Sequence, residues 1–223
     1  MNTISYTNLA KMCAFVEERA LTRQSDRTAQ LRREADAAGN TQSSAAQADL
    51  LALLVRLTHS SSVIAIGTGA VIESERIVDA LGGRGQLTAV DSSPEGIAAV
   101  RRLFNTLDED TQTTLRAVNA SADVFLERLN AGAYQLIVVS GDPANYAPAF
   151  AQAPRLLDDG GMIVFTDVMA MEGTDANGGM LNPADRSAKA VAMRELLDTV
   201  ESDERFDATL TPVGTGMLLA LRR

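Results

Sequence analysis

The stretch VIAIGTGAVIES, residues 63–74, decides how this chain folds. It begins with apolar, mostly β-branched residues, continues through Gly67, Thr68 and Gly69, and ends in a segment with helical spacing. A buried strand that turns on glycines into a helix is typical of the first unit of a parallel α/β sheet. In such sheets a ligand binds beyond the carboxyl ends of the strands, where glycines let the backbone approach it and helix N-termini offer free N–H groups. The stretch therefore predicts an α/β fold with a ligand site at this turn.

The same alternation continues along the chain. Short apolar runs separated by helical patterns predict further strands, and with the first they cover residues 62–67, 85–91, 113–118, 134–140 and 161–167. Residues 187–201 predict a helix, and residues 206–223 predict a hairpin split by Pro212–Gly216. The N-terminal part predicts three helices, over 4–20, 25–38 and 44–57. We therefore expect one α/β domain over residues 1–223, with a helical cap over 1–60 and a core over 61–223.

Composition excludes several classes of protein. The 223 residues carry a net charge of −9, so phosphate backbones are repelled and nucleic acid is not an expected partner. No apolar stretch is long enough to span a bilayer, and the start lacks the pattern of a signal peptide, so we expect no membrane partner and a cytoplasmic location. The single Cys13 forms no intrachain disulfide, and no Cys/His cluster for zinc is present.

The kind of ligand follows from the turn and from the next strand. A dinucleotide fingerprint requires a third glycine at position 72, where Ile72 stands, and no Tyr-x-x-x-Lys motif lies near residues 134–140, so an NAD-linked oxidoreductase is disfavoured. Asp91 ends the second strand, where a carboxylate can accept hydrogen bonds from both ribose hydroxyls of an adenosine. A tight turn followed by a capping Asp is the plainer interpretation of the same residues.

Five segments together resemble a known family. They are VIAIGTGAVIES, LTAVDSSPE, YQLIVVSGDPANY, RLLDDGGMIVFTD and SDERFDATLTPVGTGMLLALRR. In order and spacing they are similar to class I S-adenosylmethionine-dependent O-methyltransferases, and most similar to the small catechol/caffeoyl-CoA O-methyltransferase-like group. The resemblance implies a Rossmann-like seven-stranded sheet, mostly parallel with an antiparallel C-terminal strand, and helices on both faces. It also implies S-adenosyl-L-methionine as cofactor, S-adenosylhomocysteine as product, and a homodimer.

The resemblance assigns cofactor contacts to eight positions. Gly67, Thr68 and Gly69 are expected behind the methionine end and the sugar, and Asp91 and Ser92 at the ribose. Ser121 and Ala122 are expected along the adenine, and Ser140 near the sulfonium. The chain departs from the family pattern at three positions of the glycine turn. Ala65 replaces a glutamate, Val71 replaces a glycine and Glu73 replaces a serine.

Methyl transfer to a hydroxyl also requires that its proton be removed, by a base or by a metal that lowers its pKa. Metal-dependent members of the family use two Asp and one Asn, and these positions hold Ser140, Thr166 and Asp167 here. Pro143 stands at a family lysine, and Thr215 stands at the acid of a terminal Gly-Asp-Gly. One carboxylate is a poor set of ligands for Mg²⁺, so we expect no tightly bound metal.

The candidate general bases are Asp142 and Asp167, at the ends of neighbouring strands. Each also has a plainer interpretation, since Asp142 can open the turn before Pro143 and Asp167 can cap a strand end. Tyr146 is expected to pack in the interior, and the only histidine, His59, falls at the wrong end of the sheet.

Residues 168–186 predict a long loop, in which Met169, Met171 and Met180 suggest either an adaptable lid or a plain surface loop.

Two functions fit these residues. The first is an O-methyltransferase that acts, without a divalent metal, on a small, apolar or aromatic molecule bearing a hydroxyl group. The alternative is a protein of the same fold that binds S-adenosylmethionine or S-adenosylhomocysteine and has lost catalysis.

Overall fold

The computed structural model describes residues 6–39, 42–67, 71–108, 110–170 and 178–223. Its helices in chain order are α1 (Tyr6–Thr22), α2 (Asp26–Ala37), α3 (Ala45–Leu57), α4 (Val71–Leu81), α5 (Pro94–Leu107), α6 (Ala122–Leu126), α7 (Tyr146–Leu156) and α8 (Ala188–Glu201), with a short 3₁₀ turn, η1 (Pro143–Asn145), before α7. Its strands are β1 (Ser62–Ile66), β2 (Gln86–Asp91), β3 (Thr114–Asn119), β4 (Tyr134–Val139), β5 (Leu157–Phe165), β6 (Phe206–Thr211) and β7 (Met217–Arg222).

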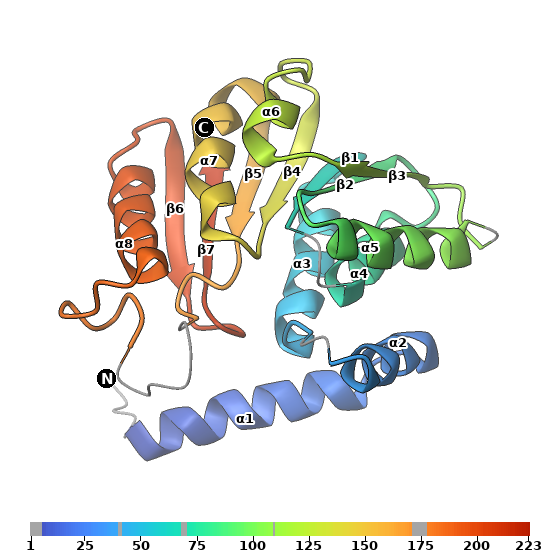
Figure 1. Ribbon diagram of the computed structural model, residues 1–223, viewed down its shortest axis with the longest axis horizontal. Helices are drawn as coiled ribbons and strands as arrows, with labels where there is room; N and C mark the ends of the chain where they lie inside the picture. Colours follow the sequence, from blue (N-terminus) through green and yellow to red (C-terminus); the bar gives the residue numbers. More distant parts are fainter. Residues whose placement is uncertain (1–5, 40–41, 68–70, 109, 171–177) are drawn as a thin grey trace.

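The seven strands form one sheet in the order β3-β2-β1-β4-β5-β7-β6 (Figure 1). Strands β1 to β5 pair in parallel, and β7 is antiparallel to both of its neighbours, β5 and β6. The order reverses beside β1, where Val63 lies opposite Leu87 of β2 on one side and Leu136 of β4 on the other. This confirms the predicted mostly parallel sheet with an antiparallel C-terminal strand.

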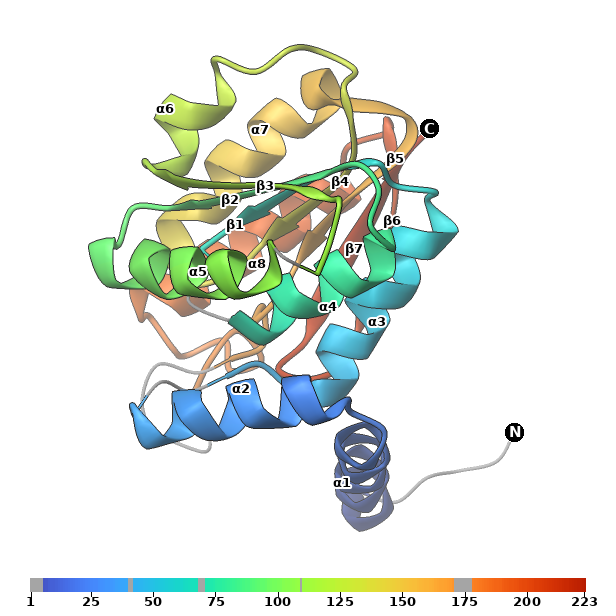
Figure 2. The ribbon, with the colours of Figure 1, turned by 90° about the vertical axis from the view of Figure 1, so that its right-hand side faces the viewer.

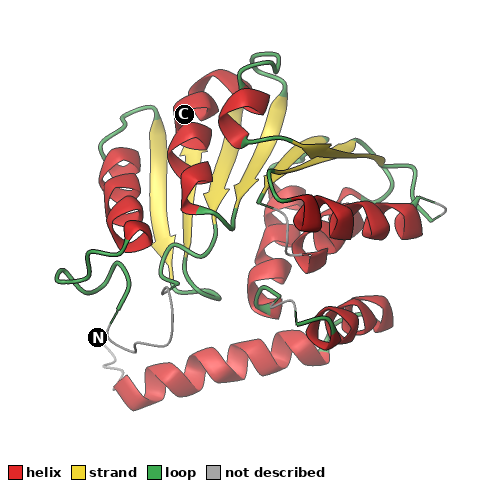
Figure 3. Cartoon of the chain, viewed as in Figure 1, coloured by secondary structure: helices red, strands yellow, loops and turns green. Residues whose placement is uncertain are grey.

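Helices cover both faces of the sheet (Figure 3). Because side chains alternate along a strand, Ile64 and Ile66 pack with α6, α7 and α8, whereas Val63 and Ala65 pack with α3, α4 and α5. All five residues of β1 are buried, which explains why this strand is apolar without alternation in the sequence.

One predicted boundary differs from the structure by more than two residues. Strand β5 begins at Leu157, four residues before the expected start, and includes Gly160 with a φ of 78° beside a register shift between β4 and β5. Two adjacent glycines in a sequence predict a break in the strand, but the backbone pairing of β5 with β4 continues past them.

The N-terminal helices lie on the side of the molecule toward which the parallel strands run (Figures 1 and 2). Glu17 on α1 fixes the start of α3: its carboxylate accepts hydrogen bonds from Ser44 Oγ at 2.5 Å and from the backbone N–H groups of Ala45 and Ala46 at 2.7 and 3.1 Å. A carboxylate at a helix N-terminus is a favourable arrangement. Within the described ranges, no helix combines the length and the apolar character that crossing a membrane requires.

Candidate active site

A cavity of about 980 Å³ opens at the carboxyl ends of β1, β2, β4 and β5. Its wall combines these strand ends with the start of α3, α5 and α8 and with the turn before β7. The lining residues are Gln42, Ser43, Ser44, Gly67, Asp91, Ser92, Ser93, Glu95, Gly96, Ala98, Ala99, Arg102, Ser140, Gly141, Asp142, Asn145, Asp167, Ala170, Lys189 and Thr215. The cavity is therefore at the switch point where an open α/β sheet binds its ligand.

The glycine turn packs directly on the end of β4. Gly67 has a φ of 74°, and a Cβ at this position would lie 1.9 Å from the backbone oxygen of Ser140. The Ser140 hydroxyl donates to the backbone oxygen of Gly67 at 2.7 Å or to that of Ile66 at 3.1 Å, so this side chain ties the ends of β1 and β4 together. Thr68 and Gly69, predicted to contact the cofactor, lie outside the described residues.

The Asp91 carboxylate lies on the cavity wall at the end of β2. Its Oδ1 accepts a hydrogen bond from Ser93 N at 2.7 Å, which orients the carboxylate over the start of α5. Gly96 leaves room for it, because a Cβ there would come within 2.4 Å of Asp91 Oδ2. Ser92 lines the cavity beside it, so the structure brings Asp91 and Ser92 together with Gly67 and Ser140.

Two predicted cofactor residues stand apart from this wall. Ser121 is exposed just before α6, and Ala122, the first residue of α6, is buried in the core. Neither is among the described residues that line the cavity. Their contact with an adenine stays a prediction.

The two candidate bases both line the cavity but differ in environment. Asp142 is exposed, and its Oδ1 accepts a hydrogen bond from Ala144 N at 2.9 Å, as expected for a residue that opens a turn. Asp167 is half-buried, has a φ of 59° and accepts a hydrogen bond from the Thr215 hydroxyl. Left-handed backbone is uncommon for a residue with a Cβ and is tolerated best by Asn and Asp.

Tyr146 is an interior residue. Its hydroxyl donates to the backbone oxygen of Thr166 at 2.8 Å, and its ring stacks on Phe165 with centroids 5.8 Å apart. Burial raises its pKa well above the ordinary value, and the charges of Asp167, Glu73 and Asp142 raise it further. Tyr146 therefore stays neutral and packs the core, in agreement with the sequence-based expectation.

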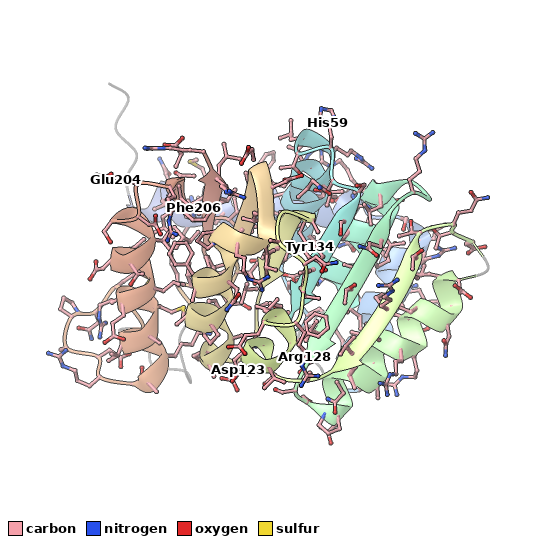
Figure 4. All side chains as sticks on the ribbon, turned by 90° about the horizontal axis from the view of Figure 1, so that it is seen from above. His59, Asp123, Arg128, Tyr134, Glu204 and Phe206 are labelled. Atoms are coloured by element: carbon pink, nitrogen blue, oxygen red, sulfur yellow. The ribbon has the colours of Figure 1, made fainter. Side chains whose placement is uncertain are left out.

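His59 lies on the opposite edge of the sheet. It is exposed in the turn before β1, at the amino ends of the parallel strands. The half-buried Tyr134, at the start of β4, lies at the same ends of the strands (Figure 4). His59 is remote from the cavity, as the sequence predicts.

The loop after β5 contributes to packing where it is described. Met180 is buried in the core with α7 and α8, and the side chain of Met169 lies over Gly216. Arg194 of α8 donates to the backbone oxygens of Met180, Asn182 and Asp185 and so holds the second half of this loop. Met171 lies outside the described residues.

Glu73 is a residue whose importance the sequence analysis missed. It lies in the first turn of α4 and is only 5% exposed, and its Oε1 accepts a hydrogen bond from Gln47 Nε2 at 2.6 Å. Burial raises its pKa to about 7; the nearby charge of Asp167 adds to this effect, while Gln47 and Ser43 favour the charged form. A signal existed, because Glu73 precedes the core residue Ile77 by four positions and therefore shares its buried face.

Comparison with known proteins identifies the family. The O-methyltransferase family model matches residues 17–223. A Mycobacterium tuberculosis protein described as a "Probable O-methyltransferase" is 31% identical over 173 residues, which cover 78% of this chain and 74% of that protein. A Mycobacterium marinum relative is 30% identical over the same shares. The chain belongs to the O-methyltransferase family of S-adenosylmethionine-dependent enzymes, as the five sequence segments indicate.

Solved structures share the fold. The O-methyltransferase from Bacillus cereus, in complex with S-adenosylhomocysteine, superimposes with a TM-score of 0.77 at 16% identity and covers 96% of this chain and 97% of its own. The O-methyltransferase TomG from Streptomyces achromogenes, in complex with S-adenosylmethionine, has a TM-score of 0.67 at 21% identity, over 91% and 89% of the two chains.

Proposed function

We propose that this enzyme transfers a methyl group from S-adenosylmethionine to the hydroxyl of a small, apolar or aromatic molecule, without a divalent metal. The observation that carries the proposal is the single cavity wall that joins Gly67 and Asp91 to the two carboxylates Asp142 and Asp167. Its volume of about 980 Å³ suits a nucleoside cofactor together with a small acceptor.

The residues on this wall fit the cofactor. Asp91 is placed to accept hydrogen bonds from ribose hydroxyls, and Gly96 keeps its carboxylate free of a clash. Gly67 lines the cavity at the turn, where the absence of a side chain lets the ends of β1 and β4 pack closely. When bound, the cofactor supplies an electrophilic methyl group on a cationic sulfur. The solved relatives that hold S-adenosylhomocysteine and S-adenosylmethionine support the same assignment for this chain.

Asp167 is the stronger candidate for the base. A base must lie within hydrogen-bond reach of the hydroxyl whose proton it takes, and Asp167 is half-buried at the cavity wall with its orientation held by Thr215. Asp142 already binds the backbone of its own turn and is exposed to water. We infer that Asp167 accepts the acceptor's proton and that Asp142 shapes the turn.

The side chains at the family's metal positions do not fit Mg²⁺. The Ser140 hydroxyl donates to backbone carbonyls, and Thr166 is fully buried with its hydroxyl 3.5 Å from the backbone oxygen of Val139. Asp167 alone offers a carboxylate, whereas Mg²⁺ requires near-octahedral oxygens with charge compensation. Across the described parts of the chain, no group of three or more His, Cys, Asp or Glu residues could hold a metal.

The experiment that tests this proposal is calorimetric titration with S-adenosylmethionine and S-adenosylhomocysteine, each with and without Mg²⁺. We expect micromolar binding that Mg²⁺ does not change and that Asp91→Ala weakens at least about tenfold, since it removes charged hydrogen bonds. Asp36→Ala, at an exposed carboxylate of α2, is the matched control and should bind normally. No binding at millimolar ligand would refute the proposal.

Turnover distinguishes the two candidate functions. With labelled cofactor and a panel of catechols and other phenols, Asp167→Asn should lower kcat about 100- to 10,000-fold, and Asp142→Asn should change it little. The reverse ranking would make Asp142 the base. Tight cofactor binding without turnover on any hydroxyl acceptor would favour the alternative, a protein of this fold that binds the cofactor and has lost catalysis.

We also infer a single domain that forms a homodimer through α1. This helix exposes Leu9, Met12, Phe15 and Val16, and a groove of about 530 Å³ runs between it and the turn at residues 212–215. Exposed apolar surface of this kind marks an interface. The cytoplasmic location expected from the sequence stays a prediction.

A further inference from the structure

The region behind the glycine turn carries a buried carboxyl, Glu73, that no lysine or arginine pairs with. Arg32 lies close by and donates to the backbone oxygen of Ser43 at 2.9 Å, but it is not among the groups that influence Glu73. Glu73 is buried, and Asp167 is near enough for its charge to raise the pKa of Glu73. No lysine or arginine is among the groups that influence Glu73. Because all twenty Lys and Arg side chains fall within the described ranges, the chain itself does not neutralise this carboxyl.

Two neutral side chains next to Glu73 have unused acceptors. Gln47 is fully buried and donates its Nε2 to Glu73, which fixes the amide orientation because only the nitrogen end can donate. Its Oε1 is buried against Gly214 and has no hydrogen-bond partner within the described chain. The buried Ser43 Oγ likewise has no hydrogen-bond partner within the described chain. It lies near enough to Glu73 to favour the charged form of that carboxyl.

This cluster borders the cofactor cavity. Ser43 and Asp167 are part of the cavity wall, and Glu73 stands in the first turn of the helix that follows Gly67. Buried acceptors without donors destabilise a protein unless a ligand supplies the donors. An ammonium group suits this site because it is a cation with three donors and no acceptor.

We propose that Glu73, with Ser43 and Gln47 beside it, binds the α-ammonium group of the methionine part of S-adenosylmethionine. The proposal rests on the proposed function, which puts the methionine end at the glycine turn. Glu73 here supplies the negative charge that Ala65, in place of a family glutamate, cannot supply. Glu73 is a binding residue and takes no proton from the acceptor.

Ligands that keep or lack the ammonium test the assignment. S-adenosylmethionine carries the ammonium and the sulfonium, S-adenosylhomocysteine carries the ammonium with a neutral sulfur, and 5′-methylthioadenosine lacks the amino acid carbons. We expect Glu73→Gln to weaken the first two ligands about 10- to 100-fold and to leave 5′-methylthioadenosine unchanged. Asp91→Ala should weaken all three.

The matched control is Glu75→Gln. Glu75 lies on the same helix and is equally buried, but its Oε2 accepts a hydrogen bond from Thr28 of α2 at 3.0 Å. The groups that influence it include Arg76 and Arg27, and none of the cluster around Glu73 is among them. Its substitution should change the binding of none of the three ligands. Urea unfolding of both variants shows whether the fold is kept.

The unmodified enzyme offers a second measurement that needs no variant. Glu73 must be ionised to pair with the ammonium, and its pKa of about 7 leaves it about half protonated at pH 7. S-adenosylhomocysteine should therefore release about half a proton at pH 7, and its affinity should fall as the pH drops below 7. 5′-Methylthioadenosine should release none. Of the titratable groups that face Glu73, Asp167 carries the other negative charge, and Tyr146 stays neutral across this range.

Each remaining outcome overturns the assignment. Loss of affinity for S-adenosylmethionine alone would mean that Glu73 faces the sulfonium, and equal loss for 5′-methylthioadenosine would mean that it acts on the nucleoside end. Unchanged binding of all three ligands would remove Glu73 from the site. If the unmodified protein binds none of them, the proposed function fails together with this inference. If the unmodified protein binds them, but neither the weaker binding by Glu73→Gln nor the proton release is seen for the ligands that carry the ammonium, the proposed function stands without this inference.

Discussion

At the residue scale, Glu73 shows how an unfavourable group can be kept in a stable fold. Burial disfavours a carboxylate, and the second charge on Asp167 adds to the penalty. A single hydrogen bond from Gln47 compensates only in part. Ligand sites commonly hold such groups, because the binding partner supplies what the empty protein lacks.

This penalty gives a testable dependence of stability on pH. The pKa of Glu73 is raised from 4.5 to about 7, so its protonated form stabilises the fold below pH 4.5, and this contribution is lost as the pH rises through 7. Glu73→Gln, which stays neutral, should be more stable than the unmodified protein by about 3 kcal/mol at pH 8 and nearly equal to it at pH 4.5. Urea unfolding at both pH values measures this, with the exposed Glu18→Gln as control. An equal difference at the two pH values would contradict the burial of the charge.

At the element scale, helix α5 positions the part of the cavity wall that holds Asp91. Ser93 caps this helix by accepting a hydrogen bond from Gly96 N at 3.1 Å, and Pro94 occupies its first position. Asp91 lies over this helix start, so the helix can present its N–H groups to the carboxylate only if residue 96 lacks a side chain.

Gly96→Ala should therefore separate stability from binding. Alanine in a helix is more stable than glycine by about 1 kcal/mol, but its Cβ would displace the Asp91 carboxylate. We expect a fold that is as stable as before or more so, with affinity for S-adenosylhomocysteine lowered about tenfold. Asn105→Ala, at an exposed position of the same helix, should raise stability without changing affinity. Thermal unfolding and calorimetry test both variants, and normal binding by Gly96→Ala would mean that Asp91 does not need its present orientation.

At the scale of the whole molecule, α1 is the element with the least cover. It packs on α3 through Glu17, yet it stands off the sheet (Figure 2). It also exposes a row of apolar side chains. The side chain of Phe15 is 63% exposed, and Leu9, Met12 and Val16 recur at helical spacing beside it.

If this face is the subunit interface, a charge placed in it should split the dimer. We expect the unmodified protein to sediment as a dimer and Phe15→Glu to sediment as a monomer, because a buried unpaired carboxylate opposes association. Ala10→Glu places the same charge at an exposed position on another side of this helix and should leave the dimer intact. A monomeric unmodified protein would contradict the inferred homodimer.

The sequence by itself determined the order and type of the elements and the end of the sheet at which the cavity opens. Apolar runs such as residues 63–66, separated by helical spacing, can be satisfied only by a parallel sheet covered on both faces, and the turn at Gly67 follows from that topology. Only the tertiary structure decided which charges lie beside the site. It brings Gln47 of α3 and Asp167 after β5 next to Glu73 of α4, from positions 26 and 94 residues away in the chain. Strand and helix periodicity reports which face of an element is buried, whereas a buried carboxylate and its missing cation depend on which elements meet, and no local pattern in the sequence records that.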